Sequence, residues 1–221
     1  MTDIIKSKFL SDLPGVAHGF GVGACEIDDM VGDGLRIFDT NQVHGCRVVR
    51  LRREDQSKKI EADAFITNEP GIVCHVRTAD CVPILIADTK RRAVAAVHAG
   101  WRGTALGVAA EALREMDRAY GTDPADCVAA IGPCICGPCY EVGREVIEAL
   151  QALAIGDVWR VDERHVDLGA ANLALLKNAG VKEIEALENC TACEPRFASW
   201  RRDGSKHRQI NYILIGTVPQ L

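Results

Sequence analysis

Residues 79–100 have the sequence ADCVPILIADTKRRAVAAVHAG, and this stretch decides the fold. Two runs of apolar residues, 82–87 and 93–97, flank the polar segment 88–92. Short apolar runs bounded by turn signals are typical of buried strands, and the short polar link between these two indicates a hairpin. We therefore expect the core to be built around this hairpin.

Similar apolar runs and helical patterns lie along the rest of the chain. Further strands are expected at 62–67, 71–76, 127–131, 182–186 and 209–216. Helices are expected at 104–121, 141–154 and 167–180, the last with Asp167 as its N-cap. Because strands and helices do not alternate regularly, the pattern predicts a mixed or two-sheet α/β domain rather than a doubly wound one. No linker divides residues 1–221, so a single domain is expected.

Composition narrows the functional classes. The chain has 221 residues, 48% of them hydrophobic, and a net charge of −5, which argues against a nucleic-acid partner. No apolar stretch is long enough to span a membrane and residues 1–15 lack the features of a signal peptide, so a cytoplasmic protein without a membrane partner is expected. In that reducing compartment the ten cysteines are expected to be metal ligands, nucleophiles or core residues rather than disulfides. Monomer and homodimer both stay open.

Three short segments place a metal-binding residue type beside a glycine or proline at the boundary of an expected element. They are 41–45, 78–83 and 98–104, and they contain His44, Cys81 and His98 respectively. Three protein ligands suit a catalytic zinc site, which keeps one position for water or substrate. The three residues lie far apart in the sequence, so ordinary hydrogen-bonded histidines and an inert thiol remain alternatives.

Two further polar residues lie next to these candidates. Arg102 belongs to a glycine-flanked Trp-Arg pair before the helix expected to begin at Thr104, and a guanidinium beside a helix N-terminus suits an anion such as phosphate. The alternative is that Arg102 only caps a neighbouring loop. Asp80 is either a turn residue or a carboxylate that orients a histidine or relays a proton.

Five segments carry a family resemblance. They are NQVHG (41–45), TADCVPILIAD (78–88), AAVHAGWRGT (95–104), AAIGPCICGPCYEVG (129–143) and CTACEPRFASWRRDG (190–204). In this order they resemble the YfiH family, also called the laccase-domain or multicopper polyphenol oxidoreductase family, over roughly residues 13–216. The resemblance implies a mixed α/β sandwich and a catalytic zinc bound by His44, Cys81 and His98.

The resemblance also implies an activity. It is phosphorolysis of purine nucleosides (adenosine, inosine, guanosine and methylthioadenosine) with phosphate as co-substrate, together with adenosine deamination; the metal is zinc, with copper as the alternative. On this basis the catalytic candidates are Asp80, Cys81, His98 and Arg102, and the substrate-binding candidates are Gln42, Trp101, Arg102 and Arg202.

Other functions stay open. Relatives are also described as peptidoglycan-editing hydrolases and as copper-dependent polyphenol oxidases, although six histidines are few for a multicopper cluster. A metal-free hydrolase would use Cys81 as a nucleophile activated by His98. A non-catalytic, nucleoside-binding member is suggested by two departures from the family pattern: Gly-Val-Gly at 21–23 replaces the segment that carries a substrate arginine, and His207 replaces a glycine.

A second group of cysteines lies in two close-spaced sets, Cys134, Cys136 and Cys139 in one and Cys190 and Cys193 in the other. If the two loops meet, four of these thiols can form a zinc or iron–sulfur site. From sequence alone, free thiols are the expectation. The remaining cysteines, Cys25, Cys46, Cys74 and Cys127, are expected to be ordinary small residues.

Overall fold

The predicted hairpin lies at the centre of a six-stranded sheet. The structure, a computed structural model, describes residues 3–56 and 59–217. In it β8 (Val82–Asp88) and β9 (Ala93–Ala99) pair antiparallel. The sheet is completed by β10 (Cys127–Ile131), β11 (Glu183–Ala186), β6 (Ala64–Thr67) and β4 (Val48–Arg50), in the order β11-β10-β8-β9-β6-β4. Every residue of β8 and β9 is buried, which explains why both are apolar except for Asp88 and His98 near their ends.

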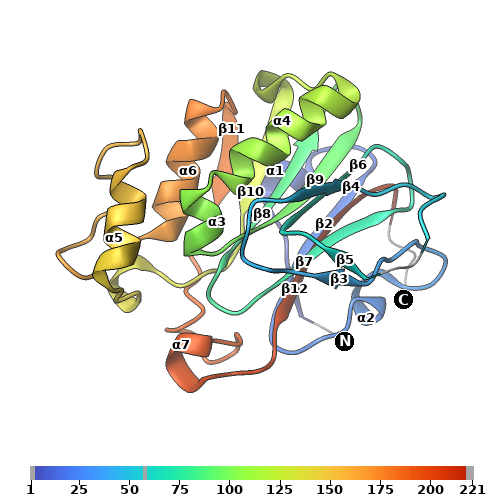
Figure 1. Ribbon diagram of the computed structural model, residues 1–221. Coiled ribbons are helices and arrows are strands. Elements are labelled where there is room, and N and C mark those ends of the chain that lie inside the picture. Colours follow the sequence, from blue (N-terminus) through green and yellow to red (C-terminus); the bar gives the residue numbers. More distant parts are fainter. Residues whose placement is uncertain (1–2, 57–58, 218–221) are drawn as a thin grey trace.

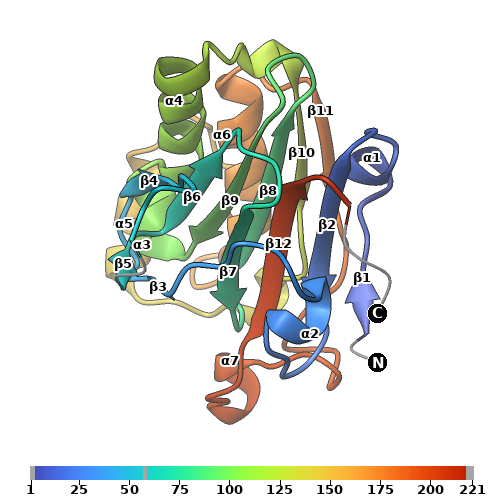
Figure 2. The same ribbon diagram turned by 90° about the vertical axis from the view of Figure 1, so that its right-hand side faces the viewer.

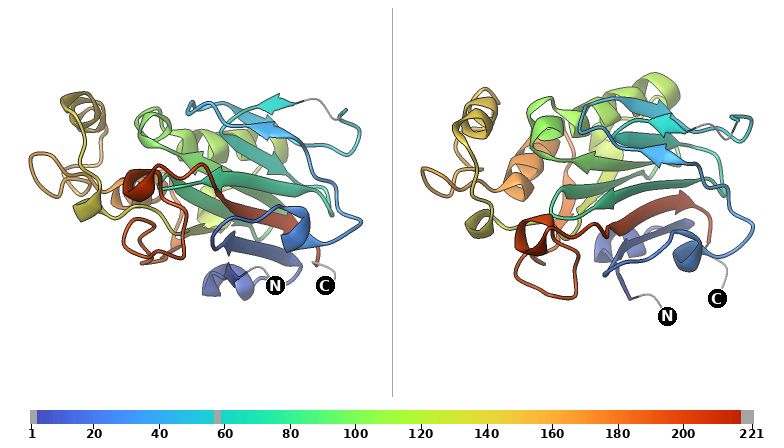
Figure 3. Two further views of the ribbon diagram at one scale, coloured as in Figure 1. Left: turned by 90° about the horizontal axis from the view of Figure 1, so that it is seen from below. Right: turned by 60° about the horizontal axis from the view of Figure 1, so that its bottom comes forward.

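A second sheet packs against one face of the first. Its strands are β1 (Ile4–Ile5), β2 (Val16–Gly21), β12 (Gln209–Ile215) and β7 (Val73–Thr78), in the order β1-β2-β12-β7. Figures 2 and 3 show the two sheets stacked. Leu85 and Ala96 of the first sheet and Cys74 and Ile213 of the second belong to the hydrophobic cluster between them. A short parallel pair joins β3 (Thr40–Asn41) to β5 (Ile60–Glu61).

Helices cover the other face of the six-stranded sheet, as Figure 1 shows. Of the long helices, α4 (Val108–Tyr120) and α6 (Leu168–Asn178) lie on this face, whereas α5 (Arg144–Gln151) lies beyond the sheet and contacts α3. Because side chains alternate along a strand, Ile84, Ala95 and Val97 face these helices while their neighbours face the second sheet. The short helices are α1 (Lys8–Ser11), α2 (Asp28–Val31), α3 (Trp101–Ala105) and α7 (Trp200–Asp203), with 3-10 turns η1 (Pro124–Asp126) and η2 (Gly137–Cys139).

This architecture confirms the predicted mixed α/β sandwich with flanking helices, and Asp167 caps α6 as expected by accepting a hydrogen bond from the Ala170 N–H. The helix expected at 104–121 is wrong in two ways. It is split into α3 and α4, because Gly107 adopts a left-handed conformation with φ 73°, and it begins at Trp101 rather than at Thr104. Leu106, next to the break, is 59% exposed. Among the described residues, no helix is long and apolar enough to cross a membrane.

Candidate metal centre

The open end of the β8–β9 hairpin brings the candidate residues together. Val82 pairs with Ala99, so Cys81, one residue before β8, lies opposite Gly100, one residue after β9. On the other side of β9, Ala64 pairs with Val97. Continuing that register puts Asp63 opposite His98, and the His98 N–H donates to the Asp63 carbonyl oxygen at 2.7 Å.

The structure brings the three predicted ligands to one point. One donor atom from each of His44, Cys81 and His98 lies within 4.8 Å of the other two. The two imidazole rings meet edge to face, with centroids 4.8 Å apart and planes at 83°. His98 is buried and His44 is exposed. Two imidazoles and one thiolate form a donor set that suits a zinc ion with one further position for a small ligand.

Asp63 holds this arrangement, and sequence reasoning missed it. Its Oδ1 lies 2.8 Å from His98 Nδ1 and accepts the His44 N–H at 2.9 Å. Its Oδ2 accepts the N–H groups of Gly45 at 2.7 Å and Val43 at 3.3 Å. Burial raises the pKa of this carboxyl, but the hydrogen bonds from His98 and Gly45 outweigh it and the pKa is lowered. The only sequence signal was a charged residue beside the apolar run 64–67, which the prediction had placed inside a strand at 62–67.

The contact with Asp63 also fixes which histidine nitrogen faces the thiol. When Nδ1 of His98 donates to the carboxylate, Nε2 is the nitrogen that faces the thiol and that can bind a metal once it has lost its proton. Burial raises the pKa of Cys81, but hydrogen bonds from His44 and His98 lower it to about 6, so the thiolate dominates at neutral pH. Burial lowers the pKa of His98, yet Asp63 and Cys81 raise it to about 9. The site thus favours a thiolate, the form that binds a metal.

The backbone around the three candidate ligands adopts unfavourable conformations and leaves little space. His44 and Asp80 have φ values of 59° and 86°, the left-handed region that non-glycine residues rarely adopt. Such residues cost about 1–3 kcal/mol each and cluster at functional sites. At Gly100 space is tight, because a Cβ there would lie 3.1 Å from both Cys81 Sγ and His44 Cδ2 and would push these atoms away by a few tenths of an ångström.

Asp80 makes contacts other than the histidine contact considered for it. Its Oδ1 accepts the Thr191 hydroxyl and its Oδ2 accepts the Arg201 N–H, both at 2.7 Å. The carboxylate that orients a histidine is Asp63, so that alternative for Asp80 is wrong. Asp80 instead fastens the segment that contains Thr191 and Arg201 to the edge of the sheet.

A cavity of about 580 Å³ contains the three donors in its wall, a size usual for small-molecule sites. Four arginines line it, whereas Asp80 is its one acidic lining residue among those described. The lining residues are Asn41, Gln42, His44, Arg77, Ala79, Asp80, Cys81, His98, Gly100, Trp101, Arg102, Tyr140, Trp200, Arg201 and Arg208. Cationic and aromatic groups around a possible metal suit an anion together with a planar ring.

Two of the residues predicted to bind substrate, Trp101 and Arg102, line this cavity. Trp101 is half-buried, and the exposed Arg102 guanidinium stacks 4.2 Å from its ring. In the part of the chain that the structure describes, we find no hydrogen-bond partner for that guanidinium, which argues against Arg102 as a loop cap. The helix next to it begins at Trp101 rather than at Thr104.

The other two predicted substrate residues have structural contacts. The Gln42 amide lies in the cavity wall but donates to the Arg77 carbonyl at 2.7 Å and accepts the Arg77 N–H at 2.8 Å. Arg202 is not a lining residue. Its guanidinium donates to the carbonyl oxygens of Thr191 at 2.8 Å and Phe197 at 2.7 Å, so the structure does not bring it to the cavity. Arg77, Arg201 and Arg208, which sequence reasoning had not selected, line the cavity instead.

Comparisons with known proteins find relatives over most of the chain. A family model described as multi-copper polyphenol oxidoreductase laccase matches residues 29–216. The chain is 38% identical over 169 residues to a purine nucleoside phosphorylase of Deinococcus radiodurans, covering 75% of this chain and 64% of that relative, less than two thirds of its length. It is 38% identical over 220 residues to adenosine deaminase RL5 of an unknown prokaryotic organism, covering 83% and 82%. The solved structure of a Bacillus licheniformis protein called YfiH matches with a TM-score of 0.84 at 28% identity, over 90% of this chain and 92% of that one.

Proposed function

The chain belongs to the YfiH family of multi-copper polyphenol oxidoreductase laccases, and from that membership we propose that it is a zinc-dependent purine nucleoside phosphorylase. The observation that carries the proposal is the meeting of His44, Cys81 and His98 in the wall of an arginine-lined cavity. Relatives called purine nucleoside phosphorylase in Deinococcus radiodurans and Escherichia coli support the activity.

The donor set decides which metal we propose. Two imidazoles and a thiolate suit zinc, whereas a multicopper cluster needs more histidines than the two that line this cavity. When bound there by His44, Cys81 and His98, zinc supplies a Lewis acid that orients phosphate or lowers the pKa of water. Asp63 holds His98 in the tautomer that this binding requires.

The residues of the chain itself bind and orient the two substrates. In phosphorolysis an oxygen of phosphate bonds to C1′ of the ribose while the bond from C1′ to the base breaks, giving ribose 1-phosphate and the free base. Arg102 and the neighbouring arginines of the cavity neutralise the phosphate charge and fix its orientation. Trp101, Tyr140 and Trp200 offer aromatic faces to the purine.

Adenosine deamination is the second candidate, because the relative called adenosine deaminase RL5 matches over 82% of its length. It requires water in place of phosphate: water adds to the purine carbon that holds the amino group, and ammonia leaves. One cavity that accepts either nucleophile accounts for both activities.

The test incubates zinc-loaded protein with adenosine, inosine, guanosine or methylthioadenosine, with and without phosphate, and separates the products by chromatography. Phosphate-dependent release of free base is expected, and phosphate-independent formation of inosine from adenosine would show deamination. Substitution of His98 by Ala should abolish both activities and the zinc bound at this site. His165→Ala is the matched control, since His165 contacts Asp162 outside the cavity.

Other outcomes would overturn the proposal. Activity that survives chelation but is lost on thiol alkylation would support the Cys81 hydrolase. Oxidation of phenols by copper-loaded protein would support the polyphenol oxidase, and cleavage of muropeptide precursors would support the peptidoglycan-editing hydrolase. Binding of nucleosides without turnover by zinc-loaded protein would support the non-catalytic alternative.

A further inference from the structure

A second cluster of thiols lies outside the cavity. Cys136 and Cys139 form one pair with two residues between them, and Cys190 and Cys193 form another. No two of these four sulfur atoms are more than 4.8 Å apart, and Cys139 Sγ lies 3.3 Å from Cys193 Sγ. None of the four lines the cavity of the first site, so this cluster is separate from it.

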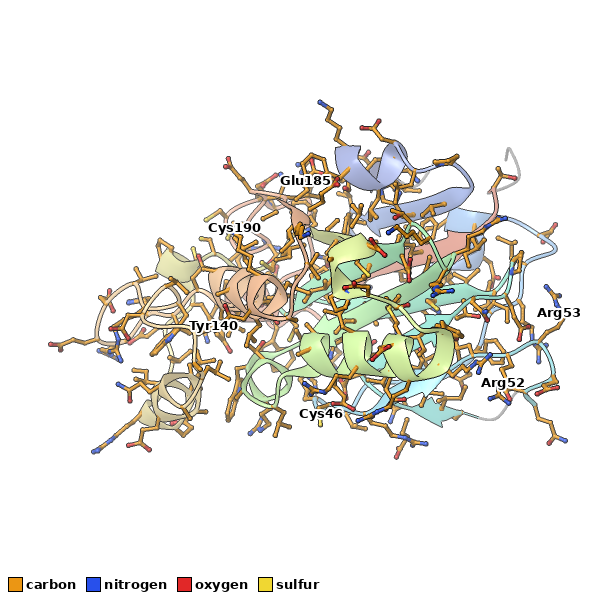
Figure 4. All side chains as sticks on the ribbon, turned by 90° about the horizontal axis from the view of Figure 1, so that it is seen from above. Cys46, Arg52, Arg53, Tyr140, Glu185 and Cys190 are labelled. Carbon is orange, nitrogen blue, oxygen red and sulfur yellow. The ribbon has the colours of Figure 1, made fainter. Side chains whose placement is uncertain are left out.

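The fold itself brings the two loops together. Cys134 and Cys190 form an isolated parallel bridge, in which the Thr191 N–H donates to the Cys134 carbonyl at 3.0 Å. Each pair then lies on a tight turn: the Cys139 N–H donates to the Cys136 carbonyl at 3.1 Å, and the Glu194 N–H to the Cys190 carbonyl at 3.0 Å. These turns direct all four thiols to one point. Figure 4 shows Cys190 at the same end of the molecule as Tyr140, which follows Cys139 in sequence.

We propose that Cys136, Cys139, Cys190 and Cys193 bind one zinc ion in a closed, structural site. Tetrahedral zinc with Zn–S bonds of about 2.3 Å places its sulfur ligands about 3.8 Å apart. The sulfurs of this chain, 3.3 to 4.8 Å apart where the structure gives a distance or an upper limit, reach that arrangement with movements of less than about 1 Å. Two Cys-x-x-Cys pairs are the usual ligand spacing of such zinc sites.

The surroundings favour four thiolates around a cation. The Cys136 N–H donates to Cys190 Sγ at 3.3 Å, a contact that stabilises the anionic sulfur. The Arg202 guanidinium donates to the carbonyl oxygens of Thr191 and Glu194. It therefore adds a positive charge to the turn that holds Cys190 and Cys193, beside a site whose net charge with zinc would be negative. Cys193 is exposed, which leaves a route for the metal to enter.

The position of the cluster indicates its purpose. Thr191, between two of the ligands, donates its hydroxyl to Asp80, and Tyr140, next to Cys139, lines the cavity. A zinc ion here would join two loops that are far apart in sequence and hold both against the cavity. With four protein ligands it has no position for substrate, so its role is structural.

The test measures zinc per chain by mass spectrometry in the purified full-length protein and its variants. Wild type is expected to hold about two zinc ions per chain. Cys139→Ser combined with Cys193→Ser should lose one, and His98→Ala should lose the other. Cys134→Ser is the matched control, since Cys134 is on the same loop but outside the four-thiol group, and it should keep both.

A second measurement protects the test against a misfolded double variant. The His98→Ala protein keeps only the cysteine cluster, so cobalt(II) added to it in place of zinc should give the strong thiolate-to-cobalt absorption of a four-sulfur site. A cobalt spectrum without that absorption would overturn the proposal. So would bound iron, a Cys139–Cys193 disulfide in freshly purified protein, or an unchanged zinc content in the double cysteine variant. If wild type turns over no nucleoside while His98→Ala still holds the zinc of the cysteine cluster, the proposed function alone is overturned and the cluster proposal stands.

Discussion

Replacement of Asp63 by Asn tests whether this carboxylate organises the metal centre. The aspartate accepts four hydrogen bonds, two on each oxygen: His98 and the His44 N–H on Oδ1, and the N–H groups of Val43 and Gly45 on Oδ2. Asparagine has one oxygen, so two of the four contacts must face an NH2 group. If its oxygen takes the place of Oδ2, the NH2 group meets the His44 N–H and leaves His98 with its proton on Nε2, the nitrogen needed for the metal.

These contacts set the expected loss of stability and of zinc affinity in Asp63→Asn. Hydrogen bonds to a charged group contribute about 1.5–3 kcal/mol each, so the loss of the His44 contact should lower the free energy of unfolding by about 1.5–3 kcal/mol. Loss of such a partner also weakens metal binding by roughly 10–100-fold. Urea denaturation measures the first effect and competition with a chromophoric chelator measures the second.

Asp88→Asn is the matched control for this experiment. Asp88 is also buried and lies at the other end of the same hairpin. Its Oδ1 accepts the N–H groups of Lys90 and Arg91, whereas its Oδ2 has no partner among the described residues. Asparagine can keep both contacts, so a change below about 1 kcal/mol is expected. Equal stability and zinc affinity in wild type and Asp63→Asn would refute the role assigned to Asp63.

Three further predictions follow from contacts of single residues. Gly100→Ala should reduce zinc affinity at least about 10-fold, because its Cβ would lie 3.1 Å from Cys81 Sγ and His44 Cδ2; unchanged affinity in the chelator assay would contradict this crowding. Arg202→Lys should lower unfolding free energy by about 1–3 kcal/mol, since an ammonium cannot reach the same set of carbonyls, while KM for phosphate stays unchanged; a raised KM would return Arg202 to the substrate site. Burial, with Lys6 nearby, lowers the pKa of His18 to about 4. The unfolded chain therefore binds the extra proton first, and stability should fall by on the order of 3 kcal/mol between pH 6.5 and 4; an equally steep fall in His18→Gln would contradict that source.

The sequence allowed His44, Cys81 and His98 to be selected as candidate ligands because each lies at the boundary of an expected element. Asp63 was not predicted as a site residue because its role depends on strand register. Only when Ala64 is known to pair with Val97 does Asp63 come opposite His98, and the apolar pattern of 62–67 does not specify that pairing.

The sequence also could not show which of two adjacent arginines lines the cavity. Arg201 and Arg202 belong to the same motif and differ by one position on α7. One step along a helix turns the side-chain direction by about 100°, so Arg201 lines the cavity while Arg202 contacts the loop carbonyls. The cysteine pairs show a related limit of prediction from sequence. Their spacing was visible in the sequence, but the bridge that joins their loops was not.

The place of β12 in the second sheet has a kinetic consequence. This strand lies between β2 and β7 and pairs Asn211 with Phe20, so the core between the sheets cannot close until segments from opposite ends of the described chain meet. Contacts between such distant segments slow folding. During that delay all ten cysteines, free thiols in the structure, are open to oxidation and to mispairing. Efficient refolding in vitro should therefore require a reductant from the first moment of dilution, and a folding yield independent of redox conditions would show that the thiols are protected early.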